Sequence, residues 1–285
     1  MSNNPAITET IRAEESRFDS ALASAAKHIC SSAEKRFLLL GGGSCSGKTT
    51  CAEKLQSMIC AFGRECHVLS LDDYYRSLDE SVYLPDGTRD VESIRSLRLD
   101  ILCEDLKKIA AGETVRVPFF DFTVRRRLDL HRELRAGQND VVIIEGLHAL
   151  NPQITGGIVG SEELLSVYLY ADPGDGSDRR LIRRLVRDSR HRDSGAVRTF
   201  GMWNTVRSSE RITIEPFSAD ADISLNTFLP YERGLLDPLA VPVLAAVPKH
   251  SRWHRRAQGM IKELSCPAPV PPELVPQHSL LREFI

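Results

Sequence analysis

The sequence predicts an α/β fold in which a five-stranded parallel sheet is flanked by helices. Short apolar runs alternate with longer stretches of helical periodicity, an order that is typical of parallel strands joined by right-handed crossovers. With 285 residues, of which 42% are hydrophobic, the chain can bury one large core with appendages. The predicted strands are residues 37–40, 67–71, 141–144, 167–170 and 223–225.

The first predicted element is a helix over residues 5–30. This segment is rich in Ala, Glu and Arg, and its apolar residues recur at near-helical spacing. We expect an amphipathic helix that lies outside the core fold. Its apolar positions are Ile7, Ile11, Phe18, Ala21, Leu22, Ala25 and Ile29.

A glycine-rich loop follows the first strand. Residues Gly42 to Thr49 fit the pattern G-x-x-x-x-G-K-[ST], and a helical run over residues 49–61 follows them. The glycines let backbone amides surround a β-phosphate, and the helix presents its positive N-terminal end to the same group. Lys48 would reach the outer phosphates and Thr49 would bind magnesium. Strand, loop and helix together predict the P-loop NTPase fold and a nucleoside triphosphate ligand.

Carboxylates stand at the ends of two later strands. Asp72 and Asp73 follow residues 67–71, and Glu145 follows residues 141–144 in the manner of a Walker B element with Glu in place of Asp. A charged residue is also the ordinary end of a strand that leaves the core. Phosphoryl transfer to a hydroxyl needs magnesium and a carboxylate that takes the proton. Beside a phosphate loop, Asp72 is therefore the predicted base and Glu145 a predicted magnesium ligand.

The segment from residue 178 to 195 is dense in arginine. Arg180, Arg183, Arg184 and Arg187 recur at three- and four-residue spacing along one helix face. Like charges this close repel unless an anion neutralises them. If the segment is a mobile lid that folds over the triphosphate, the triphosphate is that anion. The alternatives are a solvated helix and a nucleic-acid stripe.

From Asp237 onward the composition shifts to proline around one helical stretch at residues 252–264. We expect an extended C-terminal appendage. The three predicted regions are the N-terminal helix at 1–34, a nucleotide-binding domain at 35–236, and the Pro-rich appendage at 237–285.

Charge and cysteine content indicate which partners and which compartment the protein has. A net charge of -2 argues against a general nucleic-acid binder, and seven cysteines without repeated Cys-x-x-Cys pairs indicate reduced thiols. Neither a signal peptide nor an apolar run of membrane-spanning length is visible in the sequence. The sequence therefore predicts a cytoplasmic protein that binds neither membranes nor nucleic acid; it leaves the oligomeric state open, a homo-oligomer included.

The ordered set of motifs resembles the uridine kinase / phosphoribulokinase family of P-loop kinases, most closely its uridine kinase-like nucleoside kinases. The similarity runs from about residue 35 to the C-terminal Ser279–Ile285. The matching segments are residues 42–50, 70–75, 118–122, 145–148, the arginine lid, and 216–226.

The resemblance implies roles for individual residues. Asp72 and Lys48 would be catalytic, and Thr49, Glu145 and Asp72 would bind Mg²⁺. Asp90 would bind the ribose hydroxyls, Phe120 stands where uridine kinases have a tyrosine near the base, and Arg125 stands where they have a histidine that reads the pyrimidine. With Arg192, these three form the predicted substrate site. The predicted ATP-binding residues are Gly42, Gly43, Ser44, Cys45, Ser46, Gly47, Lys48, Thr49, Thr50, Arg184 and Arg187.

The leading functional hypothesis is an ATP- and Mg²⁺-dependent kinase for the 5′-hydroxyl of a nucleoside, with uridine or cytidine as the first candidates. One alternative is a kinase of the same fold that acts on a sugar phosphate or on another small alcohol such as pantothenate, which Arg125, Arg126 and Arg127 would favour. The other is a regulator that binds ATP without turnover.

Overall fold

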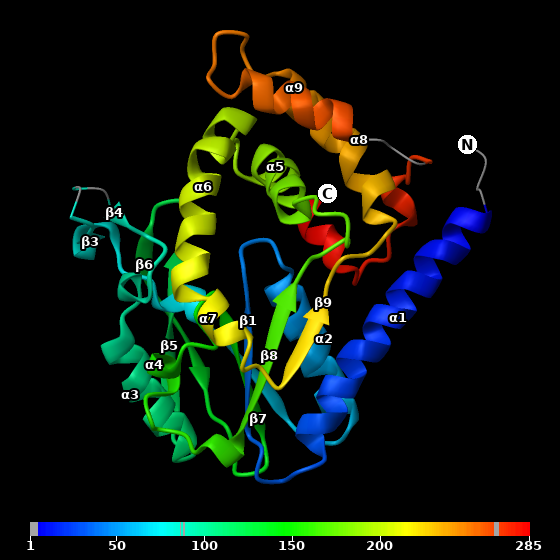
Figure 1. Ribbon diagram of the computed structural model, residues 1–285. Helices are drawn as coiled ribbons and strands as arrows, with labels where there is room; N and C mark the ends of the chain where they lie inside the picture. The colour runs from blue at the N-terminus through cyan, green and yellow to red at the C-terminus, as the bar shows by residue number, and fades with distance from the viewer. Residues whose placement is uncertain (1–4, 86, 88, 265–267) are drawn as a thin grey trace.

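The computed structural model describes residues 5–85, 87, 89–264 and 268–285. Its centre is a parallel sheet with the strand order β2-β7-β1-β8-β9 (Figure 1). This confirms the predicted fold and each predicted strand, with ends that shift by up to three residues. The strands are β1 Phe37–Gly42, β2 Cys66–Ser70, β7 Val141–Gly146, β8 Leu164–Tyr170 and β9 Ile223–Asn226.

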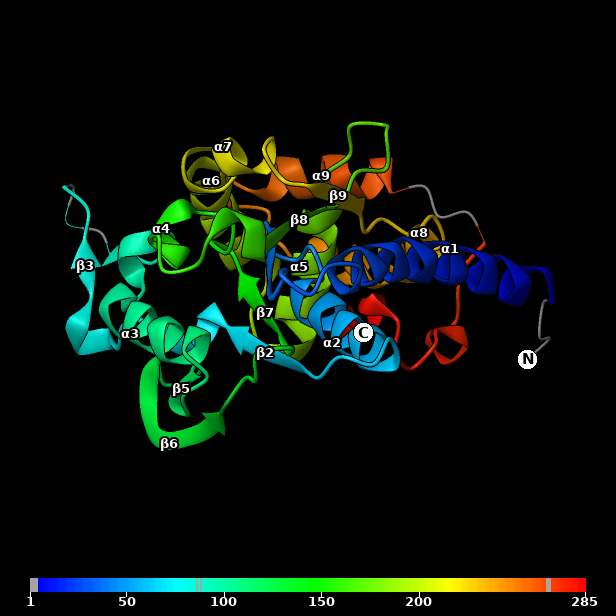
Figure 2. The ribbon, with the colours of Figure 1, turned by 90° about the horizontal axis from the view of Figure 1, so that it is seen from below.

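The two faces of the sheet bury two separate apolar clusters. Alternate residues of β1 divide between them: Leu38 and Leu40 join the larger cluster, while Phe37 and Leu39 join the smaller one. Because both faces are covered, β1 and β7 are buried along their whole length and read as continuous apolar runs. Figures 1 and 2 show α1 and α2 on one side of the sheet and α3 and α4 on the other.

The helices connect and cover the strands. Their bounds are α1 Pro5–Cys30, α2 Lys48–Ala61, α3 Leu99–Ala110, α4 Pro152–Thr155, α5 Arg179–His191, α6 Ala196–Thr213, α7 Glu215–Ser218, α8 Glu232–Ala245 and α9 His254–Glu263. None of the helices in the described part of the chain has the length and apolar character of a membrane span.

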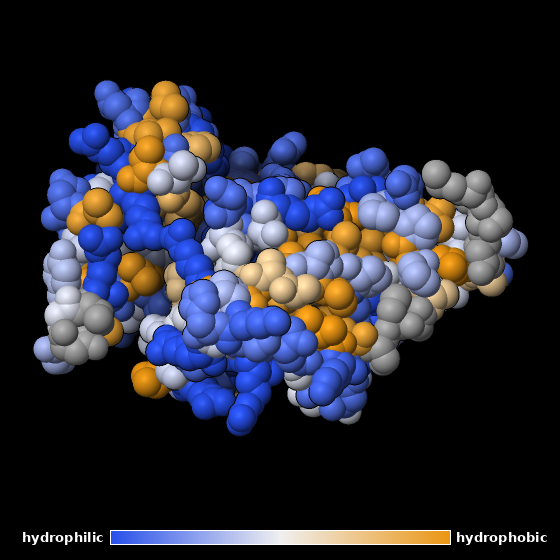
Figure 3. Space-filling model, turned by 90° about the horizontal axis from the view of Figure 1, so that it is seen from above, coloured by the Kyte–Doolittle hydropathy of each residue, from blue (hydrophilic) through white to orange (hydrophobic). Residues whose placement is uncertain are grey.

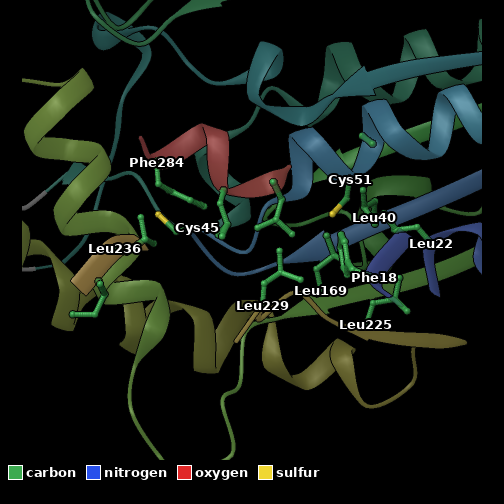
Figure 4. Packing of buried hydrophobic residues seen from close by; sticks show 14 of the residues in the cluster. Phe18, Leu22, Leu40, Cys45, Cys51, Leu169, Leu225, Leu229, Leu236 and Phe284 are labelled. Carbon is green, nitrogen blue, oxygen red and sulfur yellow. The ribbon is translucent and has the colours of Figure 1, made fainter. Parts of the chain in front are cut away.

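The N-terminal helix α1 forms as predicted, but it does not lie outside the core. Phe18, Leu22 and Ile29 are at most 3% exposed and belong to the larger apolar cluster. Figure 4 shows Phe18 and Leu22 beside Leu169 and Leu225 of the sheet. The apolar face of α1 is therefore covered by the central sheet and the residues packed on it.

The C-terminal region is more ordered than the expected extended appendage. Helix α8 continues through Pro238 and Pro242, and α9 confirms the helix predicted near residues 252–264. The chain then returns to the core, where Leu280, Leu281 and Phe284 are fully buried. The region boundaries at residues 34 and 236 stay a prediction, since all three regions contribute to one apolar cluster.

Two antiparallel pairs flank the sheet and were not predicted. They are β3 Val82–Tyr83 with β4 Arg89–Asp90, and β5 Val115–Asp121 with β6 Arg126–Leu134. The first pair has only two residues in each strand, and in the second Pro118 lies inside β5 next to an irregularity in the pairing. Both pairs lie on the same side of the molecule as α3 (Figure 2).

Candidate active site

The glycine-rich loop joins β1 to α2, as the sequence predicts. Gly47 adopts φ 84°, a left-handed conformation that favours glycine, and α2 begins at the next residue. Lys48 Nζ donates to the carbonyl of Gly43 at 3.1 Å, so its side chain folds back over the loop. Thr49 and Thr50 lie in the first turn of α2, where free backbone amides attract an anion. This geometry can bind phosphate groups.

Tight packing around the loop explains its small residues. A Cβ atom on Gly42 would lie 2.6 Å from the carbonyl oxygen of Leu169. Ser46 is fully buried and Cys45 is 4% exposed. Cys45 has φ 61° in spite of its side chain, so the loop turns left-handed at two places.

Ser44 links the loop to two helices, and the sequence analysis missed this role. Its amide donates to Glu210 Oε1 of α6 at 2.8 Å, and its hydroxyl accepts a hydrogen bond from Arg184 Nη1 of α5 at 3.1 Å. The partners lie 166 and 140 residues away along the chain. No local pattern could have indicated these contacts.

The predicted carboxylates do meet at the carboxyl edge of the sheet. Strand pairing sets Ser70 of β2 and Leu40 of β1 opposite Glu145 of β7. Ser70 Oγ donates to Glu145 Oε1 at 2.5 Å. Asp72 lies just beyond β2 in a short 3₁₀ turn, Leu71–Tyr74. The parallel register therefore brings both acids to the side of the sheet that carries the phosphate loop.

Electrostatics connect these acids with the loop lysine. The surrounding protein partly desolvates the carboxyl of Asp72 and raises its pKa, although its surface is open to solvent; the positive charges of Lys48, Arg192 and Arg187 oppose that rise. Burial raises the pKa of Glu145 to about 7, and the negative charge of Asp72 adds to this effect. Asp72 remains exposed to solvent, so it is available to a ligand.

The oxygen donors here fit a hard cation such as Mg²⁺. Asp72 raises the pKa of Glu145, and a divalent ion beside these two carboxylates would favour their charged forms. Thr49 adds a hydroxyl at the start of α2. Across the described ranges, no group of three or more His, Cys, Asp or Glu residues is arranged to hold a metal. Mg²⁺ at nucleotide sites is usually bound by one or two carboxylates together with water and substrate phosphates. The ligand set Thr49, Glu145 and Asp72 stays a prediction.

The predicted substrate residues Asp90 and Phe120 are both buried. Asp90 accepts hydrogen bonds from the amide and hydroxyl of Ser93 at 3.0 and 2.5 Å. Phe120 is 8% exposed and packs against Tyr75 and Phe122, with ring centroids 5.9 and 4.9 Å away. Burial raises the pKa of Tyr75, and the charges of Asp72 and Glu145 add to the rise, so this aromatic cluster lies near the two carboxylates.

Glu92 is a further acid that the sequence analysis did not select. Burial raises its pKa to about 7, and the main opposing influence is the positive charge of Arg184. The negative charges of Glu210 and Asp90 reinforce the shift. Glu92 is thus close enough to Arg184 of α5 and to Asp90 for their charges to act on it. Figure 3 shows a recess bordered by hydrophilic residues on the β3–β4 side of the molecule.

The three consecutive arginines do not form one anion site. Arg125 has φ 52° in the turn between β5 and β6 and is exposed, as is Arg126. Arg127 instead donates to both carboxylate oxygens of Glu80, at 2.9 and 3.0 Å. The charge of Arg127 is therefore neutralised within the protein.

Helix α5 carries the predicted lid arginines, but it is not a solvated helix. Arg183 is fully buried and pairs with Glu232 at 2.6 Å, and Arg179 pairs with Asp237 at 2.8 Å. The predicted repulsion is relieved by carboxylates of α8 and α6 rather than by a ligand alone.

The arginines predicted to bind ATP or the substrate have weaker partners. Arg184 and Arg187 contact Asp188 at 3.3 and 3.2 Å, and Arg187 also reaches Glu283 at 3.3 Å. Arg192 keeps 54% of its side chain exposed, 3.9 Å from Asp188. Arg187 and Arg192 lie near Asp72, because the positive charges of both lower its pKa.

Comparison with known proteins supports the fold and identifies the family. The model of the phosphoribulokinase / uridine kinase family matches residues 37–229, which is more than half of the chain. Uridine kinase of Staphylococcus aureus strain JH9 is 28% identical over 185 residues, which are 65% of this chain and 84% of the relative. A candidate fructose transport system kinase of Silicibacter sp. TM1040 shares the fold, with a TM-score of 0.50 and 17% identity over 71% of this chain and 98% of that one. From the matched family model, and in agreement with the fold and the motifs, the chain belongs to the phosphoribulokinase / uridine kinase family.

Proposed function

We propose that this protein transfers the γ-phosphate of ATP to the 5′-hydroxyl of a nucleoside, with uridine or cytidine as the first candidates. The observation that carries the proposal is the placement of Asp72. It follows β2 at the carboxyl edge of the sheet and is exposed, and the positive charge of Lys48 acts on it. A protein that only binds ATP has no need of a base at this position. The similarity to curated uridine kinases supports a nucleoside as the acceptor.

In this proposal each residue has a distinct role. Asp72 orients the acceptor hydroxyl and takes its proton, and its raised pKa brings it closer to the pH at which it works. Lys48, Arg184 and Arg187 stabilise the negative charge of the phosphates during transfer. Mg²⁺, when bound, neutralises phosphate charge; Thr49 and Glu145 would hold it from the loop and from β7.

Recognition of the acceptor would depend on the residues around the recess. Asp90 would accept hydrogen bonds from the ribose hydroxyls, and the cluster of Phe120, Phe122 and Tyr75 offers aromatic faces to a base. Arg125 and Arg192 are exposed and complete the proposed substrate site. Two pairs of acidic groups border this site: the charge of Asp72 acts on Glu145, and that of Asp90 acts on Glu92. This local negative charge favours an uncharged acceptor.

The alternative acceptor is a sugar phosphate or a small alcohol such as pantothenate. Exposed Arg125 and Arg126 support an anionic acceptor, although Arg127 does not, since Glu80 neutralises it. A regulator that binds ATP without turnover is the remaining alternative.

An acceptor panel separates these functions. Purified wild-type protein is incubated with Mg²⁺, ATP and, one at a time, uridine, cytidine, purine nucleosides, sugar phosphates and pantothenate, and ADP release is followed. We expect turnover with uridine or cytidine and none with the sugar phosphates. Turnover confined to an anionic acceptor would replace the proposal with its alternative, while ATP binding without any turnover would favour the regulator.

A further inference from the structure

Glu210 is the most heavily bonded carboxylate at the phosphate loop, and none of the roles above uses it. It lies on α6, is 2% exposed, and accepts hydrogen bonds from three residues. Oε1 receives the Ser44 amide and Arg180 Nη1, both at 2.8 Å. Oε2 receives Arg180 Nη2 at 2.9 Å and Arg207 Nη1 at 2.7 Å. A carboxylate with this number of charged donors is firmly held.

Arg180 and Glu210 form a bidentate ion pair, and each of them also hydrogen-bonds the backbone of Ser44 in the loop. Besides its two bonds to Glu210, Arg180 Nη1 donates to the carbonyl of Ser44 at 3.2 Å. Both backbone polar groups of Ser44 are thus fixed by the Arg180–Glu210 pair. The fit leaves no space at the neighbouring residue, because a Cβ atom on Gly43 would lie 1.9 Å from Arg180 Nη1 and 2.6 Å from Glu210 Oε1.

The same pair is anchored to the lid helix. The guanidinium groups of Arg180 and Arg184 lie 5.6 and 5.8 Å from the ring centroid of Trp203, which is 1% exposed. Trp203 Nε1 donates to Asp178, whose side chain also caps α5. Phosphate loop, α5 and α6 are therefore joined through one buried group of side chains.

We propose that Glu210 is a positioning residue for ATP: it holds the outer turn of the phosphate loop in its binding shape and keeps Arg180 away from the phosphates, so that Lys48, Arg184 and Arg187 alone face them. Glu210 acts through Ser44 and Arg180 and touches no reacting atom. Burial alone would raise the pKa of Glu210, but the bonds from Arg180, Ser44 and Arg207 lower it to about 2, so the charge that this role requires is present at neutral pH.

This role differs from that of a competitor for phosphate. A competing carboxylate would have to leave the Ser44 amide when ATP binds, and its removal would strengthen ATP binding. A positioning carboxylate stays in place, and its removal weakens ATP binding because the loop amides and Arg180 lose their fixed orientation.

The test is ATP binding by Glu210→Gln, measured by titration calorimetry with Mg²⁺ and without any acceptor. Glutamine keeps the size but removes the charge, and its amide group sets a donor against the donors of Arg180 or Ser44. We expect the dissociation constant for ATP to rise about tenfold or more, as for the loss of one charge-assisted hydrogen bond. In turnover assays, KM for ATP should rise while KM for the acceptor is unchanged. A purely structural role would lower the melting temperature and leave both constants as they are.

Two further variants keep the inference testable if Glu210→Gln does not fold. Arg207→Gln removes a donor to Glu210 that makes no contact with the loop, so it should weaken ATP binding in the same direction by a smaller factor. Glu215→Gln is the matched control. Glu215 also forms an ion pair with Arg207, at 3.4 Å, but in the described structure it makes no hydrogen bond or ion pair with the loop. Its affinity for ATP should stay within about twofold of wild type.

The role of Glu210 rests on the proposed function only in that the protein must bind ATP, so the two can fail separately. Equal ATP affinity of wild type and Glu210→Gln, or tighter binding by the variant, would overturn the positioning role alone. A wild-type protein that binds no ATP would overturn both.

Discussion

At the scale of single residues, the site depends on two carboxylates, Asp72 and Glu145, that are far apart in the sequence and close together in the folded protein. Glu145 is 4% exposed, and its pKa of about 7 reflects burial first and the charge of Asp72 second. The hydrogen bond from Ser70 only partly compensates. Glu145 therefore resists ionisation in the folded protein without nucleotide.

This resistance predicts a pH dependence of stability. The pKa of Glu145 is higher in the folded protein, at about 7, than its ordinary value of 4.5. Its contribution to stability is thus complete below about pH 4.5 and is lost as the pH rises towards 7 and above, by roughly 3 kcal/mol in total. Glu145→Gln resembles the protonated form, so it should not show this loss.

The measurement is the melting temperature of the nucleotide-free protein between pH 5 and 8. Wild type should lose stability relative to Glu145→Gln across this range, while Glu113→Gln, which alters an exposed carboxyl, should follow wild type. Parallel curves for wild type and Glu145→Gln would mean that Glu145 ionises freely in the folded state.

At the scale of elements, α5 shows what a sequence pattern can and cannot indicate. The spacing of its arginines predicted a helix with a charged face, and the helix is there. The pattern could not show which arginines form ion pairs with carboxylates inside the protein. Their partners Glu232 and Glu210 come from α8 and α6, so only the tertiary fold decides that Arg183 is buried while Arg192 is exposed.

Arg183 should therefore matter for stability. It pairs with Glu232, which is itself fully buried, and it also donates to the carbonyl of Cys45 at 3.1 Å. Arg183→Met leaves that carboxylate with one remaining partner, Arg179, at 3.3 Å. We expect a loss of about 3–5 kcal/mol in the free energy of unfolding, measured with urea.

Arg190→Met on the same helix is the control, because Arg190 is exposed; it should change the free energy of unfolding by about 0.5 kcal/mol or less. Adding Glu232→Gln to Arg183→Met should recover part of the loss, since it removes the unpaired charge. Similar losses for the two arginine variants would mean that the buried pair contributes little.

At the scale of the whole molecule, the strands were predictable because burial on both faces leaves uninterrupted apolar runs, as in residues 141–144. The phosphate loop was predictable from its glycine spacing, and the acids Asp72 and Glu145 from their places at strand ends. The covering of the sheet by α1, the path of α8 through two prolines, and the return of Phe284 to the core were not, since each depends on contacts between distant parts of the chain.

These same long-range contacts shape the site. Leu280 packs against Gly47 of the phosphate loop, 3.6 Å from the position of a Cβ atom there, and Glu283 meets Arg187. The C-terminal end of the chain thus supports the phosphate loop and α5, while the β3–β4 and β5–β6 pairs would border the proposed acceptor side. The central claim is that these two sides meet at Asp72 to transfer a phosphate.

The measurement that tests this claim most directly is phosphoryl transfer from ATP to uridine by wild type and Asp72→Asn, with ATP affinity determined on the same preparations. Our account predicts uridine 5′-monophosphate as the wild-type product and a fall in kcat of about 10²–10⁴-fold in the variant, with ATP affinity almost unchanged. An Asp72→Asn variant that phosphorylates uridine as fast as wild type would contradict it.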